Sequence, residues 1–349
     1  MWIGVQPWLR WAQLTPDVSH RLTLMVCALA MGLCSLGLPR AARSLPATWL
    51  WVVWGSVAVI ACQVRPIVLQ ALYLTQFHET AALSDGALIV VSGAWGVWAF
   101  RQYPLTWARR LRWAGLALLA VSVWMAWGQS QWGRHLGAGG LLGMDRCLGA
   151  YAVLWAPILM AWNPWLFLLP LLAVWLSGKL FAWVGLCLVI ARARWRWKWA
   201  LLLGCLIAAQ RSYMGSHALQ VIQRVTTWGP LMRALPAHPF IGWGFDPMAY
   251  GRIAAAFHPA MPNAHSDWLA LALFGGWPLA LLVGWAWWRI VRTAPTTRWM
   301  AALRTSVFAT GVCAFGQEAI SHARVAGTML LLLGWWAIER DATTTGVRR

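Results

Sequence analysis

Long apolar runs recur along almost the whole chain, from Leu22 nearly to the C-terminus. Hydrophobic residues make up 60% of the 349 residues and charged residues only 11%. A soluble domain does not bury so many apolar segments, whereas a membrane-spanning helix needs about 20 predominantly apolar residues. Many of the 31 tryptophans flank the apolar runs, and indoles prefer the membrane–water interface. The sequence therefore predicts an all-α polytopic membrane protein.

Eleven of the apolar runs are predicted to be transmembrane helices. Several are shorter than a perpendicular span requires, so tilt, bilayer thinning or longer true ends are expected. A twelfth helix at Pro66–Phe77 is an alternative, and the side of the membrane that holds the N-terminus stays open with it. The eleven runs are residues 22–38, 46–63, 86–100, 113–128, 147–162, 164–177, 178–191, 199–211, 266–288, 299–316 and 325–338.

Basic clusters between the runs predict the sidedness of the chain, because loops rich in Lys and Arg stay in the cytoplasm. The clusters are RQYPLTWARRLR (101–112), ARARWRWK (191–198), WRIVRTAPTTR (288–298) and the terminal VRR. These assignments agree if three short helices fill residues 147–191, and they place 129–146, 212–265 and 317–324 on the outer face. We expect one transmembrane domain over residues 1–349, with a single large outer loop at 212–265.

Composition and motifs exclude several classes of function. The net charge of +19 comes from arginines that fall between the apolar runs and form no continuous basic face, so nucleic-acid binding is not expected. The seven cysteines lie in or beside apolar runs without a CxxC pair, as buried small hydrophobes do. No HExxH, HxH, P-loop, dinucleotide fingerprint or GxSxG elbow is present, and carboxylates number only nine. We therefore expect neither a metal nor another cofactor.

The large outer loop holds four of the eight histidines and is the expected place of function. Its segment HPFIGWGFDP (238–247) carries Gly242 and Gly244 between prolines, which predicts a tight turn. Successive backbone amides in such a turn can bind an anion. The alternative is an ordinary loop turn, and the decapeptide alone does not separate the two.

The first part of the loop carries apolar residues at helical spacing. Leu219, Ile222, Val225 and Trp228 are expected to face the membrane from a helix that lies along its surface. Pro230 is expected to break or restart this helix.

Two arginines belong to the same region, Arg211 at the outer end of a predicted span and Arg224 in the loop. Interfacial arginines often extend toward lipid headgroups. The functional alternative is that Arg211 and Arg224 bind a diphosphate, because a guanidinium makes bidentate contacts with phosphate oxygens.

The segment PNAHSDWLALALFGG (262–276) leads directly into a predicted span. Ser266 and Asp267 are explained as a helix cap, since their oxygens accept from free backbone N–H groups and a negative charge suits the helix dipole. This cap does not account for His265. Its imidazole either has a structural role or transfers a proton, for which a side chain with a pKa of about 6.5 is well suited at neutral pH.

These segments together resemble the O-antigen ligase and O-antigen polymerase superfamily. The order is Gln210-Arg211 at the outer end of a span, then R-x3-W from Arg224, HPFIGWG, and AHSDWL followed by a glycine pair. The family carries a PL-x-G-x-G turn and an H-N-x-x-L motif with a glycine eleven residues after the histidine. The match covers residues 210 to 280, and GRHLG (133–137) is similar to an R-x-x-G of an earlier outer loop. Ser266 replaces the usual Asn, and Leu279 stands where a second glycine is common.

The resemblance implies a metal-independent glycosyltransferase of bacterial inner membranes, of the C-type architecture, with its site facing the periplasm. Such enzymes transfer a glycan from undecaprenyl diphosphate to an acceptor, as in lipopolysaccharide biosynthesis. His265 matches the family's essential histidine, and Arg211 and Arg224 match its two loop arginines. Arg134, Gly242 and Gly244 are further candidates for substrate binding. Glu318 and His322, in the last outer loop, are expected near the site because that loop faces the same side.

Several functions remain open after the resemblance. Ligation to lipid A–core, polymerisation of repeat units and transfer to a protein such as pilin are not separated by these residues. A transporter or flippase of lipid-linked glycans is the rival from another class, but it should carry ionisable residues in mid-span. The predicted spans are almost free of them, and Lys179 stands at a helix junction. A non-catalytic assembly partner is the third possibility.

Overall fold

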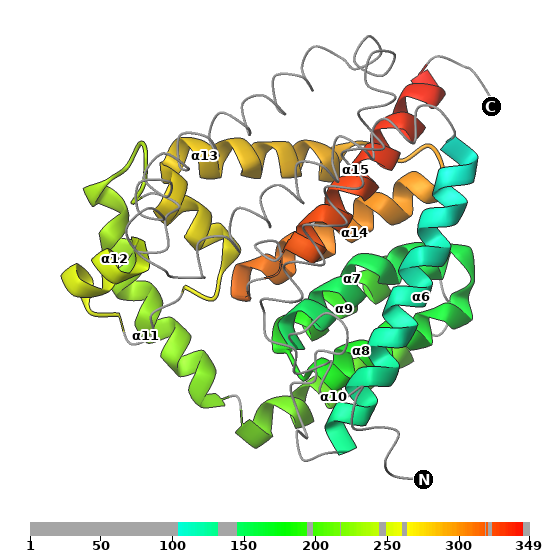
Figure 1. Ribbon diagram of the computed structural model, residues 1–349. Helices are drawn as coiled ribbons and strands as arrows, with labels where there is room; N and C mark the ends of the chain where they lie inside the picture. Colours follow the sequence, from blue (N-terminus) through cyan, green and yellow to red (C-terminus); the bar gives the residue numbers. More distant parts are fainter. Residues whose placement is uncertain are drawn as a thin grey trace, which may run out of the picture. The chain divides into compact units, whose positions relative to one another are not determined.

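The computed structural model describes residues 104–131, 145–193, 198–216, 218–243, 249–259, 264–317, 319 and 323–344. Every regular element among these residues is a helix (Figure 1), which confirms the all-α part of the predicted fold class. The helices are α6 (Pro104–Gln131), α7 (Asp145–Trp162), η2 (Pro164–Phe167), α8 (Leu168–Ser177), α9 (Leu180–Arg192), α10 (Lys198–Ser216), α11 (Ala218–Ala234), η3 (Leu235–Ala237), α12 (Ala249–Phe257), α13 (Asp267–Arg292), α14 (Arg298–Gly316) and α15 (Ala323–Thr344).

Each predicted span within the described residues coincides with a helix or with a pair of consecutive helices. The run 164–177 is divided between η2 and α8, and Lys179 is the N-cap of α9, at the predicted junction. Longer true ends are also observed, since α10 continues to Ser216. The predicted spans 22–38, 46–63 and 86–100 and the alternative helix at Pro66–Phe77 lie outside the described residues.

Two stretches of the described chain are long and apolar enough to cross a membrane, Ala108–Gly128 and Asp267–Arg292. The other apolar helices in the described part are shorter, with 10–17 residues. One or two helices of that length and composition also occur in the cores of soluble proteins, so they are weak support for a membrane fold. The structure therefore establishes an all-helical architecture for the described residues, and the polytopic membrane character of the chain stays a prediction.

The chain divides into two compact units, one of which contains residues 111–325. The other contains α15 from Ala326 onward, where the Trp335 indole donates to Glu339 Oε1 at 3.1 Å and the Arg340 guanidinium lies over Trp336. The functional residues predicted from the sequence all fall in the 111–325 unit.

Helix α7 forms the centre of this unit. Its residues from Cys147 to Leu159 are all buried, as expected for a helix that is apolar on every side. It contacts α8, α9 and α14 (Figure 1). Helix α6 packs against the C-terminal end of α7. There the centroids of the Trp113 and Trp162 rings lie 4.7 Å apart in an edge-to-face arrangement, and the Arg112 guanidinium lies over the Trp162 ring.

The predicted outer loop is itself helical. Helices α11, η3 and α12 pack together and against the first part of α13, which lies beside them in Figure 1. Helix α11 continues through Pro230 to Ala234, so the predicted break is wrong. Leu231 and Ala234, which follow the proline, are fully buried, and this packing offsets the hydrogen bond that the proline removes. The buried core of the group consists of Leu231, Ala234, Leu235, Ile253, Ala264, Ala272 and Leu273.

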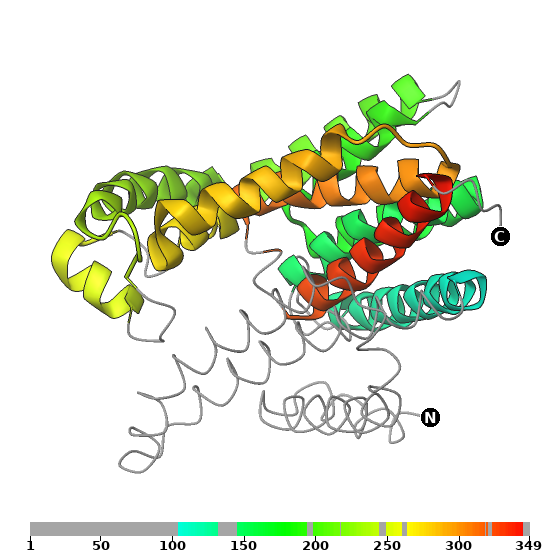
Figure 2. The same ribbon diagram turned by 90° about the horizontal axis from the view of Figure 1, so that it is seen from above.

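Helices α13 and α14 run side by side (Figure 2). Two indoles of α13 join them, since Trp268 Nε1 donates to Gly311 O at 2.8 Å and Trp287 Nε1 donates to Val307 O at 3.0 Å. Helix α13 is kinked at Gly276, whose φ is 74°. The hydrogen bond from Trp268 to Gly311 brings the start of α13 beside the last turns of α14. The candidate site lies where these two helix ends meet.

Candidate functional site

The three residues around His265 are fixed to three different elements. Ala264 O accepts from the Trp228 indole of α11 at 2.7 Å. Ser266 Oγ accepts from Leu269 N at 3.3 Å as the N-cap of α13, which confirms the predicted cap. Asp267 Oδ2 accepts from Ala319 N at 2.6 Å, beyond the end of α14. The second predicted capping residue therefore joins α13 to the segment that follows α14.

His265 lies between these anchors in a strained backbone conformation. Its φ is 47°, in the left-handed region, which costs a non-glycine residue about 1–2 kcal/mol. The side chain is half-buried. The hydrogen bonds of Ala264, Ser266 and Asp267 keep His265 in this conformation despite its cost. A partly buried imidazole whose backbone is fixed in this way is suited to proton transfer in a defined geometry.

The end of α14 receives hydrogen bonds from both sides. Arg224 Nη1 of α11 donates to Gly316 O at 2.5 Å. Ser266 Oγ donates to Ala314 O at 3.5 Å, two residues earlier on the same helix. Arg224 and the residue next to His265 are therefore attached to one turn of α14. The hydrogen bond of Arg224 Nη1 to Gly316 O also restricts the orientation of the guanidinium plane. A fixed plane favours bidentate contacts with a phosphate group.

Gln317 belongs to none of the sequence motifs described above. It is the C-cap of α14, with extended backbone angles, and its side chain is only 3% exposed. Neither Nε2 nor Oε1 has a hydrogen-bond partner. A buried polar atom without a partner costs about 1–3 kcal/mol. The signal in the sequence was a glutamine at the end of an apolar run, next to the predicted residue Glu318.

The HPFIGWG turn packs backbone to backbone against the kink of α13. Trp243 N donates to Leu273 O at 2.7 Å, and Trp277 N donates to Pro239 O at 2.8 Å. Gly242 has a φ of 65°, and its N–H donates to His238 O at 3.0 Å. A Cβ at Gly242 would lie 2.6 Å from Leu273 O, closer than side chains approach. The positive φ of Gly242 and its close contact with the backbone of α13 are therefore sufficient to explain a glycine at this position.

The remaining predicted residues are placed only in part. Arg211 lies in α10, but its side chain is outside the described part of the chain. Arg134, Gly244, Glu318 and His322 lie outside the described residues. The residues flanking Glu318, Gln317 and Ala319, belong to the candidate site. Within the described residues, no three His, Cys, Asp or Glu side chains gather as a metal site requires.

Helix α11 presents an apolar stripe on its exposed side. Ile222, Val225 and Met232 are 60%, 62% and 58% exposed. Trp228 faces the other way, toward Ala264, so its predicted place on the stripe is wrong. Its indole N–H needs an acceptor, and Ala264 O provides one inside the protein. The side chain of Leu219 lies outside the described part.

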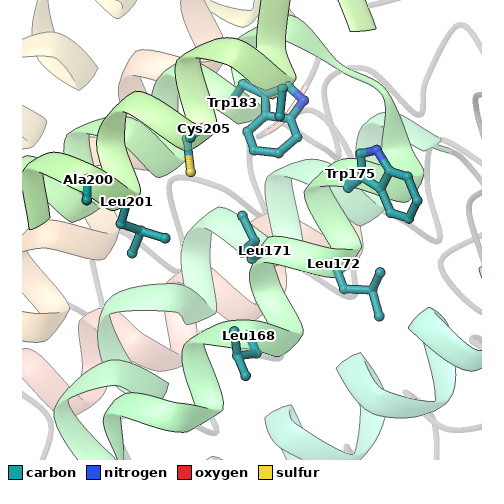
Figure 3. Close-up of a pocket in the computed structure, with 10 residues that line it drawn as sticks. Leu168, Leu171, Leu172, Trp175, Trp183, Ala200, Leu201 and Cys205 are labelled. Carbon is teal, nitrogen blue, oxygen red and sulfur yellow. The ribbon is translucent and has the colours of Figure 1, made fainter. Parts of the chain in front are cut away.

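An apolar cavity of about 410 Å³ lies between α8, α9 and α10 (Figure 3). Ala200, Gly204 and Ala208 line it from one face of α10. Arg211 follows Ala208 by three residues, which is almost one helical turn further along α10. The lining residues are Leu168, Leu171, Leu172, Trp175, Trp183, Ala200, Leu201, Gly204, Cys205 and Ala208.

No family model and no curated protein sequence matches this chain. The family resemblance therefore depends on the motifs of residues 210–280, and the function is argued from the site.

Proposed function

We propose that this protein is a membrane glycosyltransferase that transfers a glycan from undecaprenyl diphosphate to an acceptor on the outer, periplasmic face. Within this class, the resemblance favours ligation to lipid A–core or polymerisation of O-antigen units, with transfer to a protein as the alternative. The observation that carries the proposal is the attachment of Arg224 and of the His265 segment to one turn of α14.

The proposed reaction uses one base and one cationic group. The acceptor hydroxyl attacks the anomeric carbon of the sugar, and His265 takes the hydroxyl proton. The bond between this carbon and the diphosphate oxygen breaks, and the electron pair leaves with the diphosphate. Arg224, together with Arg211, stabilises the charge on the leaving diphosphate. Proximity of base and cation is the geometric requirement of this mechanism.

Exposure of the apolar helices supports the membrane part of the proposal. Only 28% of the Ala108–Gly128 window and 17% of the Asp267–Arg292 window is buried in the protein. Core helices of soluble proteins are mostly buried, so these surfaces need an apolar environment. Trp285 and Leu281 of α13 are 58% and 67% exposed, as lipid-facing side chains would be.

The apolar cavity supports the donor part. A polyprenyl chain is apolar and needs a groove between helices, whereas its diphosphate needs cations at the end of that groove. The cavity has an almost wholly hydrophobic lining, and the helix that forms one wall leads to the position of Arg211. Exposed Leu168 and Trp175 border the cavity on α8, where a lipid chain could enter from the side.

Replacement of His265 tests the proposal. Asparagine removes the base but tolerates a positive φ better than alanine does, so His265→Asn separates chemistry from backbone strain. His258→Asn is a matched control, because His258 is an exposed histidine of the same loop with a φ of 46°. Each variant is expressed in a strain that lacks the gene, and undecaprenyl-diphosphate-linked glycan and glycan bands are measured.

We expect His265→Asn to accumulate the lipid-linked glycan on the outer face and His258→Asn to behave as the unchanged protein. Equal membrane levels of both variants are the condition for this comparison. Unchanged glycan bands in His265→Asn would refute the role of His265 as the base and favour its structural role. Accumulation of the lipid-linked glycan on the inner face would favour a transporter.

A further inference from the structure

The Gln317 side chain is a buried amide that the protein itself does not satisfy. Among the described side chains with unpaired buried polar atoms, Gln317 alone has two such atoms. An amide carries two N–H donors and an acceptor oxygen, so a partner that fits it must both donate and accept. A side chain with a packing role alone would be a leucine or methionine here, since buried polar groups in native proteins almost always have partners.

Its neighbours in the chain are the anchors of the candidate site. Gly316 O accepts from Arg224, and Ala319 N donates to Asp267. Gln317 lies between them, outside the helix, in extended backbone with φ −152°. The backbone on both sides of Gln317 is therefore attached to Arg224, the proposed cation, and to Asp267, two residues after the proposed base.

We propose that Gln317 determines specificity by binding the first sugar of the lipid-linked donor, at a hydroxyl or acetamido group, an inference that rests on the proposed glycosyltransferase function. A sugar hydroxyl or acetamido group donates and accepts, so it satisfies both polar atoms of the amide. A diphosphate oxygen only accepts and would leave Oε1 unpaired, and the arginines serve it better. Both amide atoms are shielded from solvent in the structure, so sugar binding requires the side chain to rotate toward the sugar.

Gln317→Met tests the inference, because methionine has a similar length and no amide. A ligand-binding amide is dispensable for folding, so the unfolding temperature of the empty protein should stay the same or rise. The KM for the lipid-linked glycan, extracted from cells that lack the gene, should rise by at least about three- to tenfold, since the loss of one hydrogen bond alone has that effect. The inhibition constant of sugar-free undecaprenyl diphosphate should not change.

Thr310→Val is the matched control, because Thr310 Oγ1 is also buried and unpaired on α14 but lies about two turns earlier. Its KM should equal that of the unchanged protein. A similar rise of KM in Thr310→Val would show a general loosening of α14 and overturn the inference. A lower unfolding temperature of Gln317→Met would overturn it too, since the amide would then have a structural partner such as a buried water.

Binding separates this inference from the proposed function. The rise in unfolding temperature caused by the lipid-linked glycan is measured for the unchanged protein and for Gln317→Met. No rise in the unchanged protein would refute the proposed function and the inference with it. An equal rise and an equal KM in both proteins would refute the role of Gln317 alone. Parallel losses for the glycan and for sugar-free undecaprenyl diphosphate would assign the amide to the diphosphate and overturn the sugar contact.

Discussion

Replacing Gly242 by alanine is expected to destabilise the protein strongly, because the turn at Gly242 meets the backbone of α13. An alanine at φ 65° costs about 1–2 kcal/mol. Its Cβ would also lie 2.6 Å from Leu273 O and push the turn away from the helix. The two hydrogen bonds between turn and helix, Trp243 N to Leu273 O and Trp277 N to Pro239 O, contribute about 0.5–1.5 kcal/mol each. The expected loss is thus roughly 2–5 kcal/mol.

The measurement is thermal unfolding of the purified protein in detergent, with Gly251→Ala as the control. Gly251 lies in α12, and a Cβ there meets nothing within 4 Å. Alanine in a helix is favoured over glycine by about 0.5–1 kcal/mol, so the control should unfold at the same or a higher temperature. Equal unfolding temperatures of the two variants would refute the described packing. An unchanged unfolding temperature together with a raised KM for the donor would instead favour the anion-binding interpretation of this glycine.

Two further substitutions test the joint at Asp267 and the apolar cavity. Asp267→Ala leaves the buried Ala319 N–H without its carboxylate partner, so the unfolding free energy should fall by about 1–3 kcal/mol. Asp267→Asn should have an unfolding free energy between those of Asp267→Ala and the unchanged protein. Equal stability of all three proteins in chemical denaturation would contradict the described hydrogen bond between Asp267 and Ala319. Gly204→Leu fills part of the cavity, and a Cβ at this position meets no atom within 4 Å, so stability should not change. The KM should rise more for a donor with a long lipid chain than for one with a short chain. An equal change of KM for both donors would exclude the cavity as the lipid site.

Local patterns were sufficient to predict the helices and the cap. The apolar runs from 113–128 to 325–338 all fall on helices, because a run of that length has one way to satisfy its backbone hydrogen bonds in an apolar environment. Ser266 was predicted as an N-cap from its position before an apolar helix, and it accepts from Leu269 N. Pro230 shows the limit of such rules, since packing of the residues after it keeps α11 intact.

Contacts between distant segments could not be predicted in the same way. The carboxylate of Asp267 was expected to serve its own helix, but its partner Ala319 lies 52 positions away. The hydrogen bond from Arg224 to Gly316 spans 92 positions. Gln317 lacked a recognisable motif, and only its burial without a partner draws attention to it. Gly242 and Gly276 both belong to segments that the sequence singles out. The packing of Gly242 against Leu273 and of Gly276 against Pro239 nevertheless depends on the tertiary fold.

Release of undecaprenyl diphosphate by the purified chain tests the central claim most directly. The full chain is mixed with lipid-linked glycan from cells that lack the gene, with acceptor membranes from the same cells and with EDTA. We expect undecaprenyl diphosphate and glycosylated acceptor in equal amounts, a rate lower by at least about 100-fold with His265→Asn, and an unchanged rate with His258→Asn. Absence of release by the unchanged chain, or equal release by His265→Asn, would contradict the proposed glycosyl transfer.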